Sequence, residues 1–146
     1  MKDNLVTVEF EALPLNQWFS RAVVSAYMAE MDPNMEDLTE IKTAVSEAVS
    51  NAIIHGYCQK GEGKIRMEMR TLATDKLSVK IIDWGKGIED VEKAREPLFT
   101  TASSKEQSGM GFTVMETFVD KVTIETEVGK GTAVTLIKKL DNYYEF

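Results

Sequence analysis

Three short segments, far apart in the chain, carry side chains that could do chemistry together. Glu47 and Asn51 are four residues apart, so a helix would place this carboxylate and this amide one turn apart on one edge. Asp83 closes an apolar run and is followed by two glycines, so its carboxylate can accept from an amino group while the backbone passes close by. The third segment, 109–112, is a glycine turn before a helix, where free amide groups and the helix dipole favour phosphate. Together the segments indicate metal, purine and phosphate binding.

The helix that carries the first segment is predicted to begin near Asp37 and to end at about His55. Asp37 is expected to cap it, Glu40 to complete a capping box, and Gly56 to stop it. A stripe of apolar residues this broad predicts packing on a sheet. Its members are Leu38, Ile41, Val45, Ala48, Val49, Ala52 and Ile53.

The remaining elements follow from alternating and helical apolar patterns. The predicted strands are 5–10, 65–69, 77–82, 122–125 and 132–140, and the other predicted helices are 15–31 and 110–118. The polar stretch 89–108 is expected to form a short helix and a mobile lid. This order predicts an α+β fold, a two-layer α/β sandwich in which helices cover one face of a mostly antiparallel mixed sheet.

Composition narrows the class of protein. With 146 residues, 43% of them hydrophobic, we expect a single domain over 1–146 with a proper core. A net charge of −7 argues against nucleic acid and anionic membranes as partners. The N-terminal residues resemble a strand and not a signal peptide, and no apolar run is long enough for a membrane helix.

Cys58 and His55 are the only residues of their types. A single cysteine forms no internal disulfide, and one cysteine with one histidine makes no zinc set, so a reducing cytoplasm is the predicted location. Cys58 is interpreted as an ordinary packed or loop residue and not as a nucleophile. His55 is interpreted as a hydrogen-bonded residue at a helix end.

The three segments resemble the N, G1 and G2 boxes of the GHKL superfamily of ATPases and kinases, which includes gyrase, the large heat-shock chaperones, histidine kinases and MutL. The resemblance spans most of the chain and implies the Bergerat-type ATP-binding fold. Within the superfamily, stretches 38–42, 51–57 and 97–101 are similar to anti-sigma factor serine kinases, above all those of the sporulation anti-sigma F branch. The resemblance also implies that His55 is not a phosphorylation site, because sensor kinases carry their phospho-accepting histidine on a separate domain.

The resemblance implies ATP or ADP and Mg²⁺ as cofactors, and it assigns roles to individual residues. Asn51 would be the magnesium ligand, and Glu47 would be the catalytic base that accepts the proton of a serine hydroxyl. A helix amide without a ligand is the alternative for Asn51. The full set expected at the nucleotide is Asn51, Asp83, Gly85, Gly87, Thr100, Thr101, Lys105, Ser108, Gly109, Met110, Gly111, Phe112 and Thr132.

Within that set, Gly109 and Gly111 would contact phosphates, and Thr132 would assist adenine binding through water. One position departs from the pattern. The family is expected to hold the terminal phosphate with an arginine where this chain has Gln107, which supplies no charge. Lys105 could supply it from the same lid.

The resemblance further implies a protein that inhibits a sporulation sigma factor and phosphorylates a serine of an anti-anti-sigma factor. Arg21 is a candidate sigma contact, with a solvated helix residue as the alternative. The bulky side chains of the first helix, among them Trp18 and Phe19, predict a homodimer. Two other functions stay open, a nucleotide-dependent module that sequesters sigma without phosphorylation and an ATPase in which Glu47 activates water.

Overall fold

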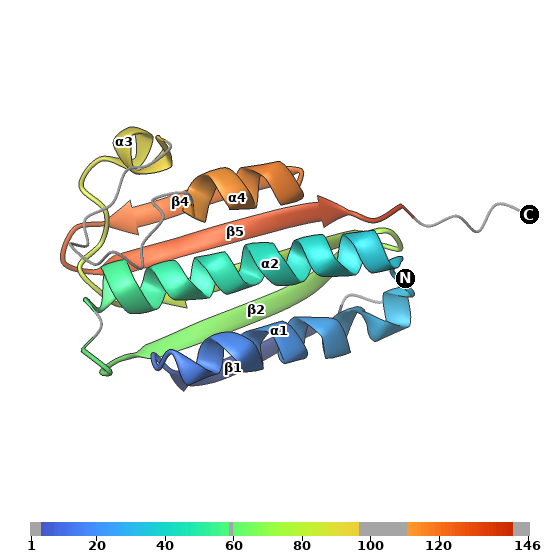
Figure 1. Cartoon of the computed structure of the whole chain (residues 1–146), viewed down its shortest axis with the longest axis horizontal. Helices are drawn as coiled ribbons and strands as arrows, with labels where there is room; N and C mark the ends of the chain where they lie inside the picture. The colour runs from blue at the N-terminus through green and yellow to red at the C-terminus, as the bar shows by residue number, and fades with distance from the viewer. Residues whose placement is uncertain (1–3, 59, 97–110, 142–146) are drawn as a thin grey trace, which may run out of the picture.

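The computed structural model describes residues 4–58, 60–96 and 111–141, and in it helices cover one face of a five-stranded sheet (Figure 1). The spatial order of the strands is β1-β2-β3-β5-β4. Their bounds are β1 Leu5–Glu11, β2 Lys64–Ala73, β3 Lys76–Asp83, β4 Lys121–Glu127 and β5 Gly131–Lys139. All four pairings between these strands are antiparallel, so the predicted α+β fold is confirmed and the described sheet has no parallel pair.

Three helices lie side by side on one face of the sheet, with α2 between α1 and α4 (Figure 1). The helices are α1 Leu15–Met28, α2 Met35–Asn51, α3 Val91–Arg95 and α4 Gly111–Phe118. A short 3-10 turn, Ala29–Met31, extends α1, and a π turn, Ala52–Gly56, extends α2. With the π turn included, the second helix ends at Gly56, which agrees with the predicted end at about His55.

The apolar stripe of α2 forms the centre of the core. Ile41, Val45 and Val49 are fully buried, and the inward residues of the sheet that are equally buried include Met67 and Val79. Each side chain of this size contributes roughly 1.5–3 kcal/mol when it leaves water. The predicted packing of this helix on a sheet is therefore confirmed, and it holds the opposite, polar edge of α2 in a fixed place.

The predicted cap of α2 is wrong. Asn34 is the N-cap, and its side-chain oxygen accepts the backbone N–H of Asp37 at 2.7 Å. Asp37 and Glu40 instead face the buried ammonium of Lys138, at 3.6 and 2.7 Å from its Nζ. Lys138 also donates to the carbonyl of Phe118 at 2.8 Å. Because Asp37 and Glu40 pair with this buried cation, neither caps the helix, and the side-chain amide of Asn34 is the cap.

Part of the predicted nucleotide set lies outside the described residues. That part comprises Thr100, Thr101, Lys105, Ser108, Gly109 and Met110, and the departure at Gln107 lies there too. Within the described ranges, no helix is long and apolar enough to cross a membrane.

Candidate functional site

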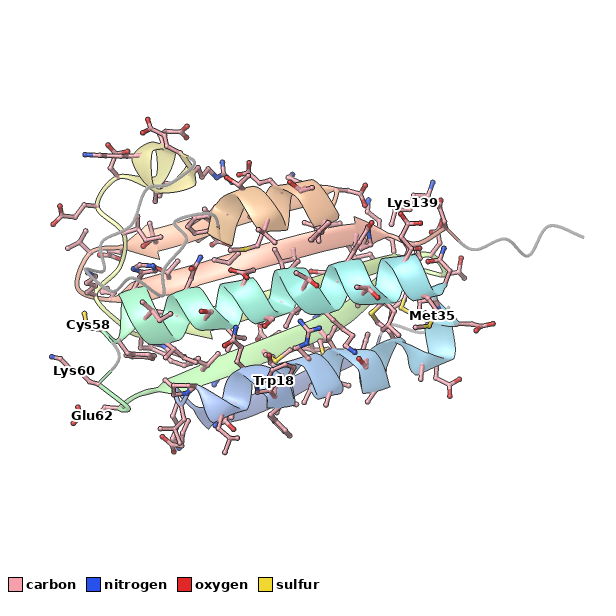
Figure 2. The ribbon with its side chains drawn as sticks, viewed as in Figure 1. Trp18, Met35, Cys58, Lys60, Glu62 and Lys139 are labelled. Carbon is pink, nitrogen blue, oxygen red and sulfur yellow. The ribbon has the colours of Figure 1, made fainter. Side chains whose placement is uncertain are left out.

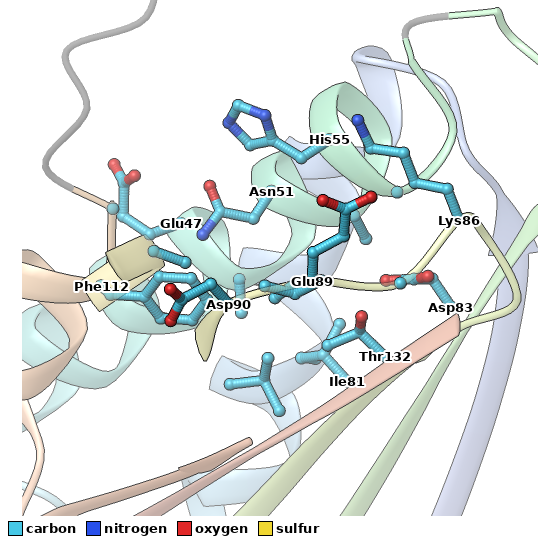
Figure 3. A pocket seen from close by; sticks show the side chains of 18 of the residues that line it. Glu47, Asn51, His55, Ile81, Asp83, Lys86, Glu89, Asp90, Phe112 and Thr132 are labelled. Atoms are coloured by element: carbon cyan, nitrogen blue, oxygen red, sulfur yellow. The ribbon is translucent and has the colours of Figure 1, made fainter. Parts of the chain in front are cut away.

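A cleft of about 600 Å³ opens between the C-terminal half of α2, the loop after β3, the start of α4 and the start of β5 (Figure 3). Its polar lining is concentrated on α2 and on the loop, while Ile81, Ile88, Phe112 and Val134 supply apolar surface. The segments that the sequence singled out therefore meet in one place, although Glu47 and Phe112 stand 65 positions apart along the chain.

The polar edge of α2 forms one wall of the cleft. Glu47, Asn51 and His55 follow one another along this edge (Figure 3). The π turn Ala52–Gly56 widens the helix where His55 stands, a distortion that is common at functional sites. Burial raises the pKa of Glu47 above its ordinary value, so this carboxylate is a better proton acceptor than an exposed glutamate. Burial, and then the charge of Lys86, lower the pKa of His55.

The amide of Asn51 lies directly against the first residue of α4. A Cβ atom at Gly111 would stand 2.9 Å from Asn51 Oδ1 and 3.0 Å from Nδ2. Any side chain at residue 111 would require this amide to shift, so Gly111 and the N box meet without a side chain between them. Within the described part of the chain, no cluster of three or more acidic, histidine or cysteine side chains could hold a metal on its own. A metal here would need oxygens from a ligand besides that of Asn51.

Asp83 lies at the far end of the cleft and is almost fully buried. Its Oδ1 accepts the N–H of Gly85 at 2.9 Å, and Gly56 packs against its carboxyl group. Burial is the largest influence on this carboxyl and raises its pKa, while the backbone N–H groups of Gly85 and Thr132 oppose that rise. A buried carboxylate with fixed donors on one side offers its remaining acceptor positions to the cleft.

Thr132 is the register partner of Asp83 on β5 and also lines the cleft. Its hydroxyl lies 2.9 Å from that of Thr126, which donates to the carbonyl of Gly131. Either hydroxyl could be the donor between the two, and in both arrangements the Thr132 oxygen keeps at least one free lone pair. The Thr132 oxygen therefore keeps acceptor capacity for a group in the cleft. Thr126 also accepts the N–H of Ile88, which ties the loop after β3 to the sheet.

Two glycines of the same loop are required by close backbone approaches. A Cβ at Gly85 would stand 2.1 Å from the carbonyl oxygen of Gly56, and one at Gly87 would stand 2.5 Å from that of Glu127. Gly87 also has a φ of +79°, which side chains rarely adopt. These glycines let the loop pass between the end of α2 and the β4–β5 turn.

The cleft gathers most of the described residues that the sequence predicted. Glu47, Asn51, Asp83, Gly87, Gly111, Phe112 and Thr132 line it. Arg21 lies elsewhere, on α1, where its guanidinium group stands 5.7 Å from the ring centroid of Trp18 and donates to the carbonyl of Lys42 at 3.4 Å.

Several cleft residues were missed from the sequence. Lys86, Glu89, Asp90 and Lys93 add charged groups to the lining. The available signal was that Lys86 stands between the two glycines of the G1 segment and that the other three follow within six residues of Gly87. Thr126 was also not predicted from the sequence, although a hairpin across the turn at 129–131 would pair it with Thr132.

Comparison with known proteins supports the resemblance. The family model described as histidine kinase-like ATPase domain matches residues 15–138. An anti-sigma F factor of Anoxybacillus flavithermus is 50% identical over 94% of this chain and 93% of its own. One of Clostridium perfringens is 49% identical over 95% of this chain and 99% of its own. The chain belongs to the anti-sigma F factor family.

Solved structures agree on the fold of this family member. The crystal structure of the RsbU and RsbW domains of a Mycobacterium tuberculosis protein matches with a TM-score of 0.65 and 24% identity, over 94% of this chain and 32% of the other. The catalytic domain of the histidine kinase ThkA matches with a TM-score of 0.57 and 20% identity, over 92% of this chain and 96% of the other. The fold is thus that of the ATPase domains of histidine kinases.

Proposed function

We propose that this member of the anti-sigma F factor family binds ATP with Mg²⁺, phosphorylates a serine of an anti-anti-sigma protein, and inhibits a sporulation sigma factor. The observation that carries the proposal is the arrangement of one cleft. At one end the amide of Asn51 lies against Gly111 and the carboxylate of Glu47 lies one helical turn away. At the other end lies the buried acid Asp83, whose register partner Thr132 carries a hydroxyl.

The buried acid suits a purine that carries an amino group. Asp83 keeps acceptor capacity toward the cleft, and Thr132 adds a hydroxyl oxygen from the neighbouring strand. The apolar side chains of Ile81 and Ile88 line the same cleft, where they can enclose the faces of a base. An adenine amino group would donate to Asp83, whereas the carbonyl of guanine at the same position would meet an acceptor and be rejected.

The opposite end suits phosphates and a hard cation. Asn51 supplies one oxygen, and the missing side chain at Gly111 leaves the Asn51 amide in its place beside the start of α4. The first turn of α4 would add free backbone amides. Mg²⁺, when bound, supplies the positive charge that offsets the charge of the transferred group. The donor set of the cleft therefore fits both groups.

Glu47 is the residue proposed to act on the incoming serine. It lies one turn from Asn51 at the mouth of the cleft, so a hydroxyl placed in line with the terminal phosphate would meet its carboxylate (Figure 3). Glu47 would accept the hydroxyl proton as the new O–P bond forms, and the terminal phosphoryl group would leave ADP. Its raised pKa makes this proton transfer more favourable.

The partner surface is proposed to lie on α1. Trp18 is 72% exposed and stands in the first turn of that helix (Figure 2). Leu15 and Phe19 extend the exposed apolar surface on either side of it. This surface supports a homodimer through α1, and Arg21, which stacks on Trp18, is proposed as the contact with the sigma factor.

A second candidate function rests on Gln107. Without an arginine at this position, the terminal phosphate has one cation less for its transfer. A protein that binds nucleotide and sequesters the sigma factor without phosphorylating a partner is therefore the alternative.

The deciding experiment measures the intact mass of an anti-anti-sigma protein after incubation with this chain, ATP and Mg²⁺. We expect one added phosphate with the natural sequence and none with Glu47→Gln, which keeps the size of the side chain but removes the base. Equal transfer by both would remove Glu47 from the mechanism. Nucleotide binding without transfer to an authentic partner would favour the sequestering module.

A further inference from the structure

Tyr57 joins three parts of the chain beside the cleft. It directly follows the π turn, and its backbone N–H bonds to the carbonyl of Ala52 at 3.0 Å. Its hydroxyl donates to the carbonyl of Lys64 at 2.7 Å and accepts the backbone N–H of Trp84 at 2.7 Å. One phenol group thus connects the end of α2, the start of β2 and the loop after β3.

The ring of Tyr57 is held in a single place by the backbone. A Cβ atom at Gly63 would stand 2.5 Å from the ring, so the ring lies flush against that residue. Gly63 has a φ of +96°, which lets the chain turn there into β2. Burial is the largest influence on the phenol and raises its pKa, so the hydroxyl keeps the proton that it donates.

The peptide that Tyr57 holds is next to Asp83, the acid proposed to bind the purine. Trp84 stands between Asp83 and Gly85, and the N–H of Gly85 is the donor to Asp83 Oδ1. On the other side, the carbonyl of Asp83 is so close to Gly131 that a Cβ there would stand 2.1 Å from it. The backbone on both sides of the carboxyl group is therefore fixed, and among the described residues the Tyr57 hydroxyl is the side-chain group that accepts the Trp84 N–H.

We propose that Tyr57 is a positioning residue that sets the preference of the cleft for adenine over guanine, acting through the Trp84 peptide on Asp83. This inference rests on the proposed nucleotide site and goes beyond it, because Tyr57 is not among the residues that line the cleft. Hydrogen bonds to a base discriminate only when the acceptor is held in place before the base arrives. Without the hydroxyl, water would satisfy Trp84 and Lys64, but it would not fix the peptide.

The chain offers a matched control in Tyr27. Its hydroxyl also has two partners, the carbonyl of Asn4 at 2.6 Å and Thr71 Oγ1 at 2.9 Å, and it packs at the edge of the core away from the cleft. Tyr27→Phe and Tyr57→Phe thus remove the same atom and the same number of contacts. The two variants should lose similar amounts of thermal stability, so a difference in nucleotide preference between them reports position and not folding.

The test is calorimetric titration of the full chain with ATP and with GTP, each with Mg²⁺. For Tyr57→Phe we expect about a tenfold loss of ATP affinity and less than about a threefold change for GTP, so the ratio of the two falls. Tyr27→Phe should keep the natural ratio. Gly63→Ala, which retains the hydroxyl but displaces the ring, should lower the ratio as Tyr57→Phe does.

The outcomes separate this inference from the proposed function. An unchanged ratio in Tyr57→Phe, when the natural chain prefers ATP, would overturn the role of Tyr57 and leave the proposed function standing. An equal fall in Tyr27→Phe would also overturn it, because the effect would then be one of general stability. If the natural chain showed no preference for ATP over GTP, the adenine site and the role of Tyr57 would both fall.

Discussion

Gly111 and Asn51 are in direct contact across two helices, since a Cβ at residue 111 would stand 2.9 Å from the side-chain oxygen of Asn51. The first residue of α4 therefore limits the space around the proposed magnesium ligand. The contact explains why a glycine stands at a helical position, where it is otherwise a poor helix former.

Gly111→Ala should separate stability from ligand binding. The added methyl group would displace the Asn51 amide, so the affinity for ATP with Mg²⁺ should fall by at least about tenfold. Alanine is the better helix former by roughly 1 kcal/mol, so the free energy of unfolding should be unchanged or higher. Titration with ATP in the presence and absence of Mg²⁺, together with thermal unfolding, measures both effects.

Gly129→Ala is the matched control. Nothing lies within 4 Å of a Cβ at Gly129, but its φ is +83°. This variant should lose roughly 1 kcal/mol of stability through backbone strain and keep its ATP affinity. Tight ATP binding by Gly111→Ala would mean that Asn51 is not the magnesium ligand.

Glu47 should make activity depend on pH on the acid side. Because burial raises the pKa of Glu47, phosphoryl transfer should increase with pH through a midpoint above the ordinary glutamate value. The measurement is the pH profile of kcat at saturating ATP. A flat profile would contradict the predicted rise, and persistent transfer by Glu47→Gln at every pH would contradict the assignment of Glu47 as the base.

The same pKa predicts an effect on stability. The folded chain holds the Glu47 proton more tightly than the unfolded chain does, so charging this group destabilises the fold above its raised pKa. Glu47→Gln should therefore raise the melting temperature at pH 7, and the difference should vanish below about pH 4, where both side chains are neutral. A lower melting temperature at pH 7 would show that the carboxylate stabilises the fold.

Much of the fold followed from periodicity, because the core stripe of α2 and the alternation in β2 and β3 each repeat over many residues. The same patterns brought Glu47, Asn51 and Asp83 to one cleft. The site could be outlined from the sequence because its residues belong to short motifs at the ends of these elements.

What the sequence could not supply depended on contacts between distant residues. Asp37 and Glu40 have the spacing of a capping box, but a buried lysine about a hundred positions later recruits them. The hydroxyl of Tyr57 likewise bonds to a backbone group 27 positions away. Local patterns identify residues that can cap or pair, and only the packed chain decides which partner each one takes.

Lys138 should be a large contributor to stability. It is 6% exposed and its ammonium group contacts Glu40, Asp37 and the carbonyl of Phe118. Lys138→Ala would leave two carboxylates without their cation, at a cost of about 3–5 kcal/mol. Chemical denaturation measures this loss.

The neighbouring Lys139 gives the control for that measurement. Its side chain is 70% exposed and stands 4.0 Å from Asp75, so Lys139→Ala should change the free energy of unfolding by less than about 1 kcal/mol. Similar losses in the two variants would mean that the buried network contributes no more than a surface pair.

Trp18 should control self-association if α1 forms a dimer surface. It is 72% exposed, whereas its neighbour Phe19 already packs edge-on against Phe10, with ring centroids 5.8 Å apart. Trp18→Glu would place a charge in the proposed interface and should weaken the dimer at least about thirtyfold, without disturbing the core.

Trp84→Glu is the control, because Trp84 is 50% exposed but lies after β3 and not on α1. Sedimentation over a range of concentrations decides: a natural chain that stays monomeric throughout, or equal weakening by both variants, would move the interface away from α1.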